Sequence, residues 1–150
     1  MKIKSLALAA LLSAAAAPAM AAECTINIEA NDAMQYNVKE IEVSKSCDEV
    51  TLNLKHVGSL PKAAMGHNVV IAKAADAQAI ATEAAAAGPA KDYLNDADER
   101  IVAHTGMVGG GEESSVTFKP SVFEDGVDYE FFCSFPGHFA IMKGAVKLVD

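Results

Sequence analysis

The sequence has few basic side chains, no long apolar run after its first 21 residues, and only three cysteines. Twelve Lys and Arg stand against 20 Asp and Glu, for a formal charge of −8. This balance argues against a nucleic-acid-binding protein, because few cations are left to neutralise phosphates. No later run reaches the roughly 18 apolar residues of a membrane span, which argues against a transmembrane protein. With an odd number of cysteines, one thiol remains after any pairing within the chain.

Residues 1–21 have the three-part pattern of a cleaved secretory signal. Two lysines precede an apolar stretch, and Ala19-Met20-Ala21 is a small-x-small cleavage site. We therefore expect residues 22–150 to form an exported domain of 129 residues. Without the two lysines, it would carry 10 basic and 20 acidic side chains, a formal charge of −10. Its length gives one domain with one core, and export would place it where disulfides are stable.

Short stretches with strand character fill most of residues 22–150. In the clearest of them, residues 50–56, apolar side chains and His56 alternate with polar ones. The expected strands are residues 24–28, 41–43, 50–56, 68–72, 100–104, 114–119, 127–133 and 144–149. Residues 73–87 are rich in alanine and precede Gly88-Pro89, which predicts one helix. About eight strands separated by turn residues predict an all-β sandwich or barrel with one helical insertion.

Two of the three cysteines lie near the start of the expected domain. Cys24 begins the first strand and Cys47 ends a short polar stretch. Metal binding is the alternative, but neither cysteine has a histidine beside it. We therefore predict a structural disulfide between Cys24 and Cys47. It would contribute about 3 kcal/mol by restricting the unfolded chain, and it would keep the first strand from fraying.

The third cysteine, Cys133, starts the motif C-x4-H-x3-M, which His138 and Met142 complete. On its own, Cys133 would be a small buried apolar residue at the end of a strand. Pro136 and Gly137 predict a turn that lets the thiol and the imidazole point to one place. Cysteine and methionine sulfur together favour a soft metal, and copper is the first candidate.

A trigonal copper site would need a second imidazole, and three other histidines are available. His56 lies on the apolar face of the strand at 50–56, which favours a neutral histidine packed in the core. His104 ends a strand beside Thr105-Gly106, where a surface side chain is the simpler interpretation. His67 lies where a loop meets an apolar strand, a position that holds a ligand rigidly. We therefore predict His67 as the second imidazole.

Together these motifs resemble the cupredoxins, the type 1 blue copper proteins. The resemblance covers residues 22–150. It includes the cysteine pair, Met65-Gly66-His67-Asn68, the helical insertion and the block from Phe131 to Gly144. The resemblance implies a plastocyanin-like domain at residues 22–150, folded as a Greek-key β-sandwich that binds one type 1 copper.

The resemblance also implies a set of ligands and of residues around them. His67, Cys133 and His138 would lie in one plane around the copper, with Met142 and the carbonyl of Gly66 as axial ligands. Two neighbours are implied to tune the redox potential. Asn68 would join the two ligand loops near the Cys133 sulfur, and the backbone N–H of Phe135 would donate a hydrogen bond to that sulfur.

Cupredoxins of this kind dock their partners on an apolar surface around the exposed edge of the last ligand histidine. We call the matching surface in this chain the apolar patch. Its expected members are Met34, Leu60, Ala64, Met65, Phe135, Pro136, His138 and Ala140. Methionine side chains are suited to weak, adaptable contacts of this kind.

We therefore expect a monomeric periplasmic carrier that cycles copper between Cu(I) and Cu(II). The family implies redox partners such as a c-type cytochrome and a copper nitrite reductase. The alternative is a non-redox protein that binds or stores copper or zinc, since cysteine and histidine also hold zinc. Met142 speaks against zinc, because a thioether does little for that metal. An enzyme is the weakest hypothesis, because four protein ligands leave no open coordination position for a substrate.

Overall fold

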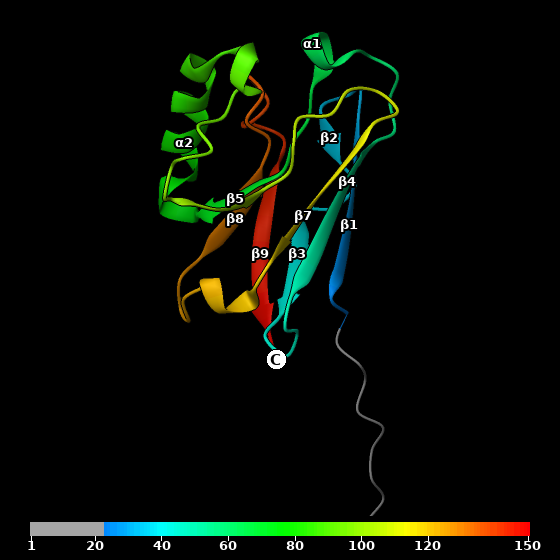
Figure 1. Cartoon of the computed structure of the whole chain (residues 1–150). Coiled ribbons are helices and arrows are strands. Elements are labelled where there is room, and N and C mark those ends of the chain that lie inside the picture. Colours follow the sequence, from blue (N-terminus) through cyan, green and yellow to red (C-terminus); the bar gives the residue numbers. More distant parts are fainter. Residues whose placement is uncertain (1–22) are drawn as a thin grey trace, which may run out of the picture.

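The computed structural model describes residues 23–150, so the expected signal at residues 1–21 lies outside the described residues. Within that range, nine strands form two sheets that pack face to face (Figure 1). The first sheet has the order β2-β1-β4-β7 and comprises β1 (Thr25–Asn31), β2 (Gln35–Tyr36), β4 (Val50–His56) and β7 (Glu113–Phe118). The second has the order β3-β9-β8-β5-β6 and comprises β3 (Glu40–Ser44), β5 (Val70–Lys73), β6 (Ile101–His104), β8 (Tyr129–Phe132) and β9 (Lys143–Val149).

The alternating pattern of β4 places one of its faces in the core between the sheets. Val50, Leu52, Leu54 and His56 are each at most 1% exposed, while the residues between them face outward. The strand lies between β1, which runs parallel to it, and β7, which runs antiparallel. Each large apolar side chain buried in this way contributes about 1.5–3 kcal/mol. The face of β4 that packs in the core therefore ends at a buried histidine.

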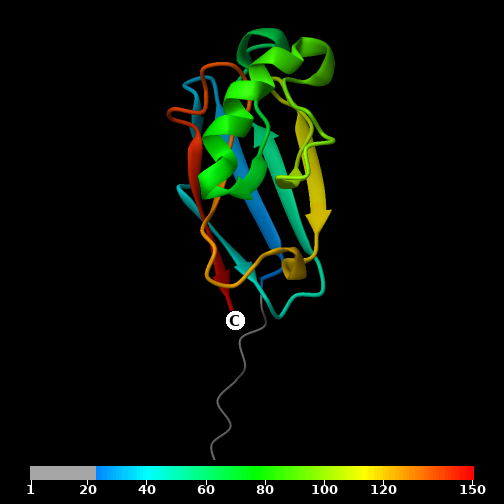
Figure 2. The same ribbon diagram turned by 90° about the vertical axis from the view of Figure 1, so that its left-hand side faces the viewer.

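Strand β5 is apolar throughout because both of its faces are covered. Ile71 packs in the core between the sheets, whereas Val70 and Ala72 pack against helix α2 (Ala74–Ala87). Figure 2 shows α2 in front of the strands of the second sheet. The helix ends at Gly88, whose φ of 75° is favourable for glycine. The helix predicted at residues 73–87 is confirmed to within one residue.

The predicted all-β sandwich with a helical insertion is confirmed, and all eight expected strands are present. Among the strands and α-helices, two were not predicted: strand β2 and the short helix α1 (Lys62–Met65). They are two and four residues long, so neither shows a periodic pattern in the sequence. Two 3-10 turns, Pro89–Lys91 and Pro120–Val122, complete the elements.

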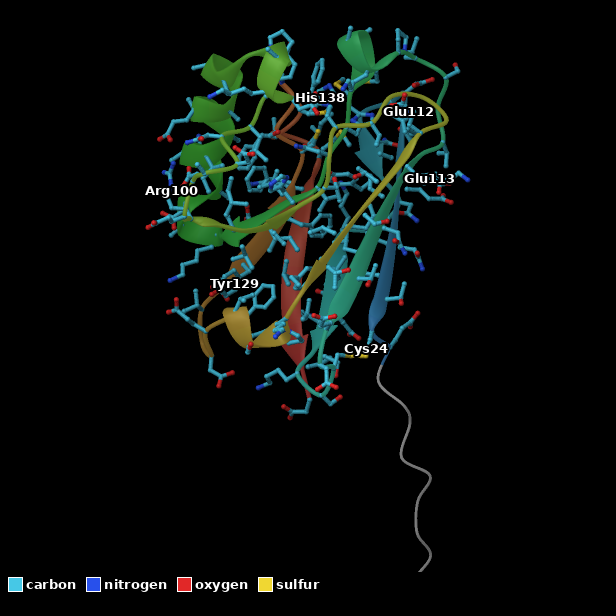
Figure 3. All side chains as sticks on the ribbon, viewed as in Figure 1. Cys24, Arg100, Glu112, Glu113, Tyr129 and His138 are labelled. Atoms are coloured by element: carbon cyan, nitrogen blue, oxygen red, sulfur yellow. A yellow bond between two sulfur atoms is a disulfide. The ribbon has the colours of Figure 1, made fainter. Side chains whose placement is uncertain are left out.

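The predicted disulfide between Cys24 and Cys47 is confirmed. It joins the residue before β1 to the loop before β4. Figure 3 shows Cys24 at one end of the sandwich and His138 at the opposite end. Among residues 23–150, no helix is long and apolar enough to cross a membrane.

Candidate metal centre

Three buried side chains meet at the end of the sandwich that carries His138 (Figure 3). The ligand atoms of His67, Cys133 and His138 all lie within 4.8 Å of one another. Their side chains come from the loop before β5 and from the segment after β8. The exposed fractions of the three residues are 0%, 0% and 3%. The geometry therefore offers one sulfur and two imidazole nitrogens in a site shielded from water.

The loop after β8 is closed by its own hydrogen bonds. The N–H of Cys133 donates to the carbonyl of Met142 at 3.0 Å, and the N–H of Met142 donates to the carbonyl of His138 at 2.8 Å. Gly137 has a φ of 83°, as the expected Pro136-Gly137 turn requires of a glycine. This closure brings Nδ1 of His138 to 3.6 Å from Sγ of Cys133.

His67 is fixed both by its backbone and by its ring. It forms an antiparallel bridge with Val108, with hydrogen bonds of 3.0 Å and 2.8 Å. Its ring places Nε2 at 2.9 Å from the carbonyl of Asn31, an acceptor, so the proton is assigned to Nε2. Nδ1 is then unprotonated and lies 3.9 Å from the Cys133 sulfur. A hydrogen bond from the other ring nitrogen is the usual support of a metal-binding histidine.

His56 is adjacent to this site, but both of its ring nitrogens are already used. Its Nδ1 accepts from the N–H of Gly58 at 3.0 Å, which leaves Nε2 to donate to the carbonyl of Met65 at 3.0 Å. The ring stacks on that of His67, with 4.5 Å between the ring centroids. These contacts describe a neutral histidine packed in the core. His104 lies apart at the end of β6, where its ring contacts the carbonyl of Thr105.

Burial dominates the electrostatics of the three side chains. It lowers the pKa of His67 to about 4 and also lowers the pKa of His138, so both imidazoles are neutral at pH 7. Burial raises the pKa of the Cys133 thiol to about 11, although backbone N–H groups of Asn68 and Phe135 act in the opposite direction. Binding a cation at the sulfur would therefore release a proton.

The two groups expected as axial ligands, Met142 and the carbonyl of Gly66, both lie near Cys133. Met142 is fully buried and packs in the cluster that contains Cys133. The carbonyl of Gly66 lies 3.9 Å from Sγ of Cys133. A Cβ at Gly66 would come within 2.7 Å of the carbonyl oxygen of Lys62, so the loop needs glycine to approach this closely. The axial roles of Met142 and Gly66 stay predictions.

Asn68 connects the two segments that carry the ligands. Its Nδ2 donates to Oγ of Ser134 at 2.8 Å, and its Oδ1 accepts from the N–H of Ser134 at 2.9 Å. Its own N–H and that of Phe135 reach the Cys133 sulfur. The sequence analysis missed Ser134, and it missed Tyr36, whose hydroxyl donates to the carbonyl of Asn68. Ser134 occupies an unspecified position of the C-x4-H-x3-M motif, and Tyr36 lies outside the motifs of the sequence analysis.

The apolar patch has an open rim and a buried centre. His138 is only 3% exposed, whereas the sequence analysis expected an exposed edge. Leu60 is 40% exposed, and the carboxylate of Asp32 holds the loop before it by accepting the N–H of Ser59 at 2.8 Å. The other members are exposed (Ala64, Pro136, Ala140) or partly buried (Met34, Met65, Phe135). Ile141, which was not predicted, is 47% exposed.

Comparison with known proteins gives consistent matches. Residues 22–149 match the family described as copper binding proteins, plastocyanin/azurin family. The azurin of Achromobacter denitrificans is 55% identical over 141 residues, which cover 94% of this chain and 95% of that protein. The azurin of Pseudomonas aeruginosa is 50% identical over 146 residues, covering 97% and 99%. A solved azurin structure from Methylomonas sp. strain J superimposes with a TM-score of 0.82 at 43% identity, covering 86% of this chain and all of that one.

Proposed function

Because this chain belongs to the plastocyanin/azurin family of copper-binding proteins, we propose that it is a periplasmic one-electron carrier. The resemblance to cupredoxins is thereby confirmed, and it narrows to azurins. Copper is the cofactor of the family, and the buried sulfur and imidazole donors fit it. The observation that carries the proposal is the water-shielded cluster of His67, Cys133 and His138.

In the proposal, Nδ1 of His67, Sγ of Cys133 and Nδ1 of His138 bind the metal, with Met142 and the Gly66 carbonyl as weaker ligands. Bound copper would supply the one-electron couple between Cu(I) and Cu(II). The chain keeps the two imidazoles neutral. It holds the ring of His67 through the carbonyl of Asn31 and holds the loop of His138 through backbone hydrogen bonds. Because packing and hydrogen bonds fix these donors, little would have to rearrange when an electron moves.

A non-redox protein that binds or stores copper or zinc is the competing function. The three cluster residues alone would also suit zinc. The full burial of Met142 next to Cys133 favours copper, since a thioether sulfur is a soft ligand. We propose a carrier and not an enzyme, because the donor set leaves no position for a substrate.

We propose that residues 1–21 are removed on export and that residues 22–150 are the copper-binding domain. The basic and apolar pattern of residues 1–21 supports the first part. The disulfide between Cys24 and Cys47 supports an oxidising compartment, for which we propose the periplasm. Copper ligation would also occupy Cys133, which would otherwise remain a free thiol there.

The partners that we propose are redox proteins such as a c-type cytochrome and a copper nitrite reductase. They would dock on the apolar patch around His138, the ligand that lies closest to this surface. Electron-transfer encounters use small interfaces and are short-lived, which suits a monomer with a few exposed apolar side chains.

A redox titration of the copper-loaded protein tests the carrier function. We expect a reversible one-electron change of colour, while a holoprotein that cannot be reduced and reoxidised would rule the carrier out.

Docking is tested by Leu60→Glu, which should slow electron exchange with a c-type cytochrome at least tenfold at an unchanged potential. Val122→Glu is the matched control, because Val122 is also apolar and is 49% exposed. It ends the turn Pro120–Val122, whose residues lie beside Cys47 at the disulfide end of the sandwich, away from the patch. Equal rates in the two variants would contradict docking at the patch.

A further inference from the structure

Tyr36 is a buried tyrosine whose hydroxyl points at the metal centre. It is only 4% exposed, and its ring packs against that of Phe131 with 5.5 Å between centroids. The hydroxyl donates to the backbone carbonyl of Asn68. The hydroxyl oxygen also lies close to the Cys133 sulfur, although its single proton is used for the carbonyl of Asn68. A buried polar hydroxyl at such a place needs a reason, since phenylalanine would fill the same space.

Asn68 is fixed by hydrogen bonds of its side chain, its backbone N–H and its backbone carbonyl. Its side chain makes two hydrogen bonds to Ser134, its N–H reaches the Cys133 sulfur, and its carbonyl accepts from Tyr36. The bonds to Ser134 hold the side-chain amide of Asn68, and the hydrogen bond from Tyr36 holds its backbone carbonyl. Without the hydroxyl, the buried carbonyl would lose this donor and the residue could shift. The position of the Asn68 N–H relative to the Cys133 sulfur therefore depends on the hydrogen bond from Tyr36.

We propose that Tyr36 is a positioning residue that raises the reduction potential of the copper site by holding Asn68 against the sulfur of Cys133. This inference rests on the proposed electron-carrier function. A hydrogen-bond donor aimed at the thiolate stabilises the state in which the sulfur is more negative, which is the reduced state. The electron comes from the redox partner, no covalent bond is made or broken, and the phenolic proton stays on its oxygen.

Tyr129 offers a matched control for this role. It is also buried, at 3% exposed, and its hydroxyl also contacts the backbone, by accepting the N–H of Glu124 at 3.1 Å. It lies at the start of β8, in the half of the sandwich away from His138 (Figure 3). Removing either hydroxyl should lower stability for the same reason, but only Tyr36 is connected to the ligand loops.

The experiment compares copper-loaded Tyr36→Phe, Tyr129→Phe and the unmodified protein. For Tyr36→Phe, we expect the equilibrium between reduced and oxidised protein to shift about tenfold toward the oxidised form, which is about 59 mV for one electron. The charge-transfer absorption of the thiolate should shift as well. Tyr129→Phe should change neither. If both variants lose stability in urea but keep the potential of the unmodified protein, Tyr36 is merely structural and the inference is wrong.

A second variant decides the question if Tyr36→Phe does not fold. Replacing Tyr36 with a tyrosine fluorinated beside the hydroxyl keeps the shape but makes a stronger donor. The potential should then rise, and an unchanged or lower potential would overturn the inference. Failure of the proposed function would look different, because the unmodified protein itself would then show no reversible copper couple.

Discussion

The row of buried histidines predicts that the metal-free protein loses stability in mild acid. His67 is fully buried between His56, which stacks on it at 4.5 Å, and His138, whose ring centroid lies 5.1 Å away. Burial lowers the pKa of His67 to about 4, and the two neighbouring rings add to this effect. Protonation of His67 is therefore far easier in the unfolded chain than in the folded protein.

The sign and the size of the effect follow from this difference. Because the folded pKa lies below the unfolded value of 6.5, the stabilisation is fully present above pH 6.5. It is lost as the pH falls toward about 4, and the total loss from His67 is about 3 kcal/mol. Burial also lowers the pKa of His138, which adds a loss in the same direction. Domains of this size are stable by about 5–15 kcal/mol, so the change is readily measured.

Urea unfolding of the metal-free protein at several pH values between 7.5 and about 4 is the assay, with the free energy of unfolding extrapolated at each pH. His67→Gln should remove about 3 kcal/mol of the pH dependence and leave the smaller part that belongs to His138. His104→Gln is the matched control, because His104 lies outside this row of histidines, and it should keep the full slope. If the unmodified protein were equally stable at pH 7 and pH 4.5, or if the two variants behaved alike, the account of the buried imidazoles would be refuted.

Three further variants test other parts of the structure. Replacing Cys24 and Cys47 together by serine should lower the free energy of unfolding by about 3 kcal/mol in urea. The absorption spectrum should stay unchanged, because the bridge lies at the far end of the sandwich. Asn68→Leu should lose about 1–3 kcal/mol, because the buried N–H of Ser134 loses its acceptor, and cyclic voltammetry should show a lower potential. Gly66→Ala should distort the copper spectrum, because its Cβ would lie 2.7 Å from a backbone carbonyl of α1; an unaltered spectrum would show that the loop can move aside.

Local sequence patterns were sufficient to predict the elements whose pattern involves only neighbouring residues. Strand β4 has the bounds that its alternation predicted, because one of its faces is in the core. The helix α2 was predicted from its alanine content and Gly88. The spacing of Cys133, His138 and Met142 could be read as a metal motif, because one closed loop contains all three.

Features that depend on packing between distant segments could not be predicted. The acceptor that sets the tautomer of His67 is the carbonyl of Asn31, which is 36 residues away in the sequence. Tyr36 reaches the metal centre only because the two-residue strand β2 pairs with the end of β1. The low exposure of His138 likewise depends on His67 of the other ligand loop, whose ring centroid lies 5.1 Å from that of His138. A single sequence contains no local signal for such contacts.

The central claim is that the sulfur of Cys133 binds copper. It is tested most directly by the visible absorption spectrum of the oxidised, copper-loaded protein beside that of Cys133→Ser. A copper–thiolate bond predicts an intense band toward the red end of the spectrum in the unmodified protein and its loss in the variant. An oxidised copper-loaded protein without that band, or a variant that keeps it, would contradict the account.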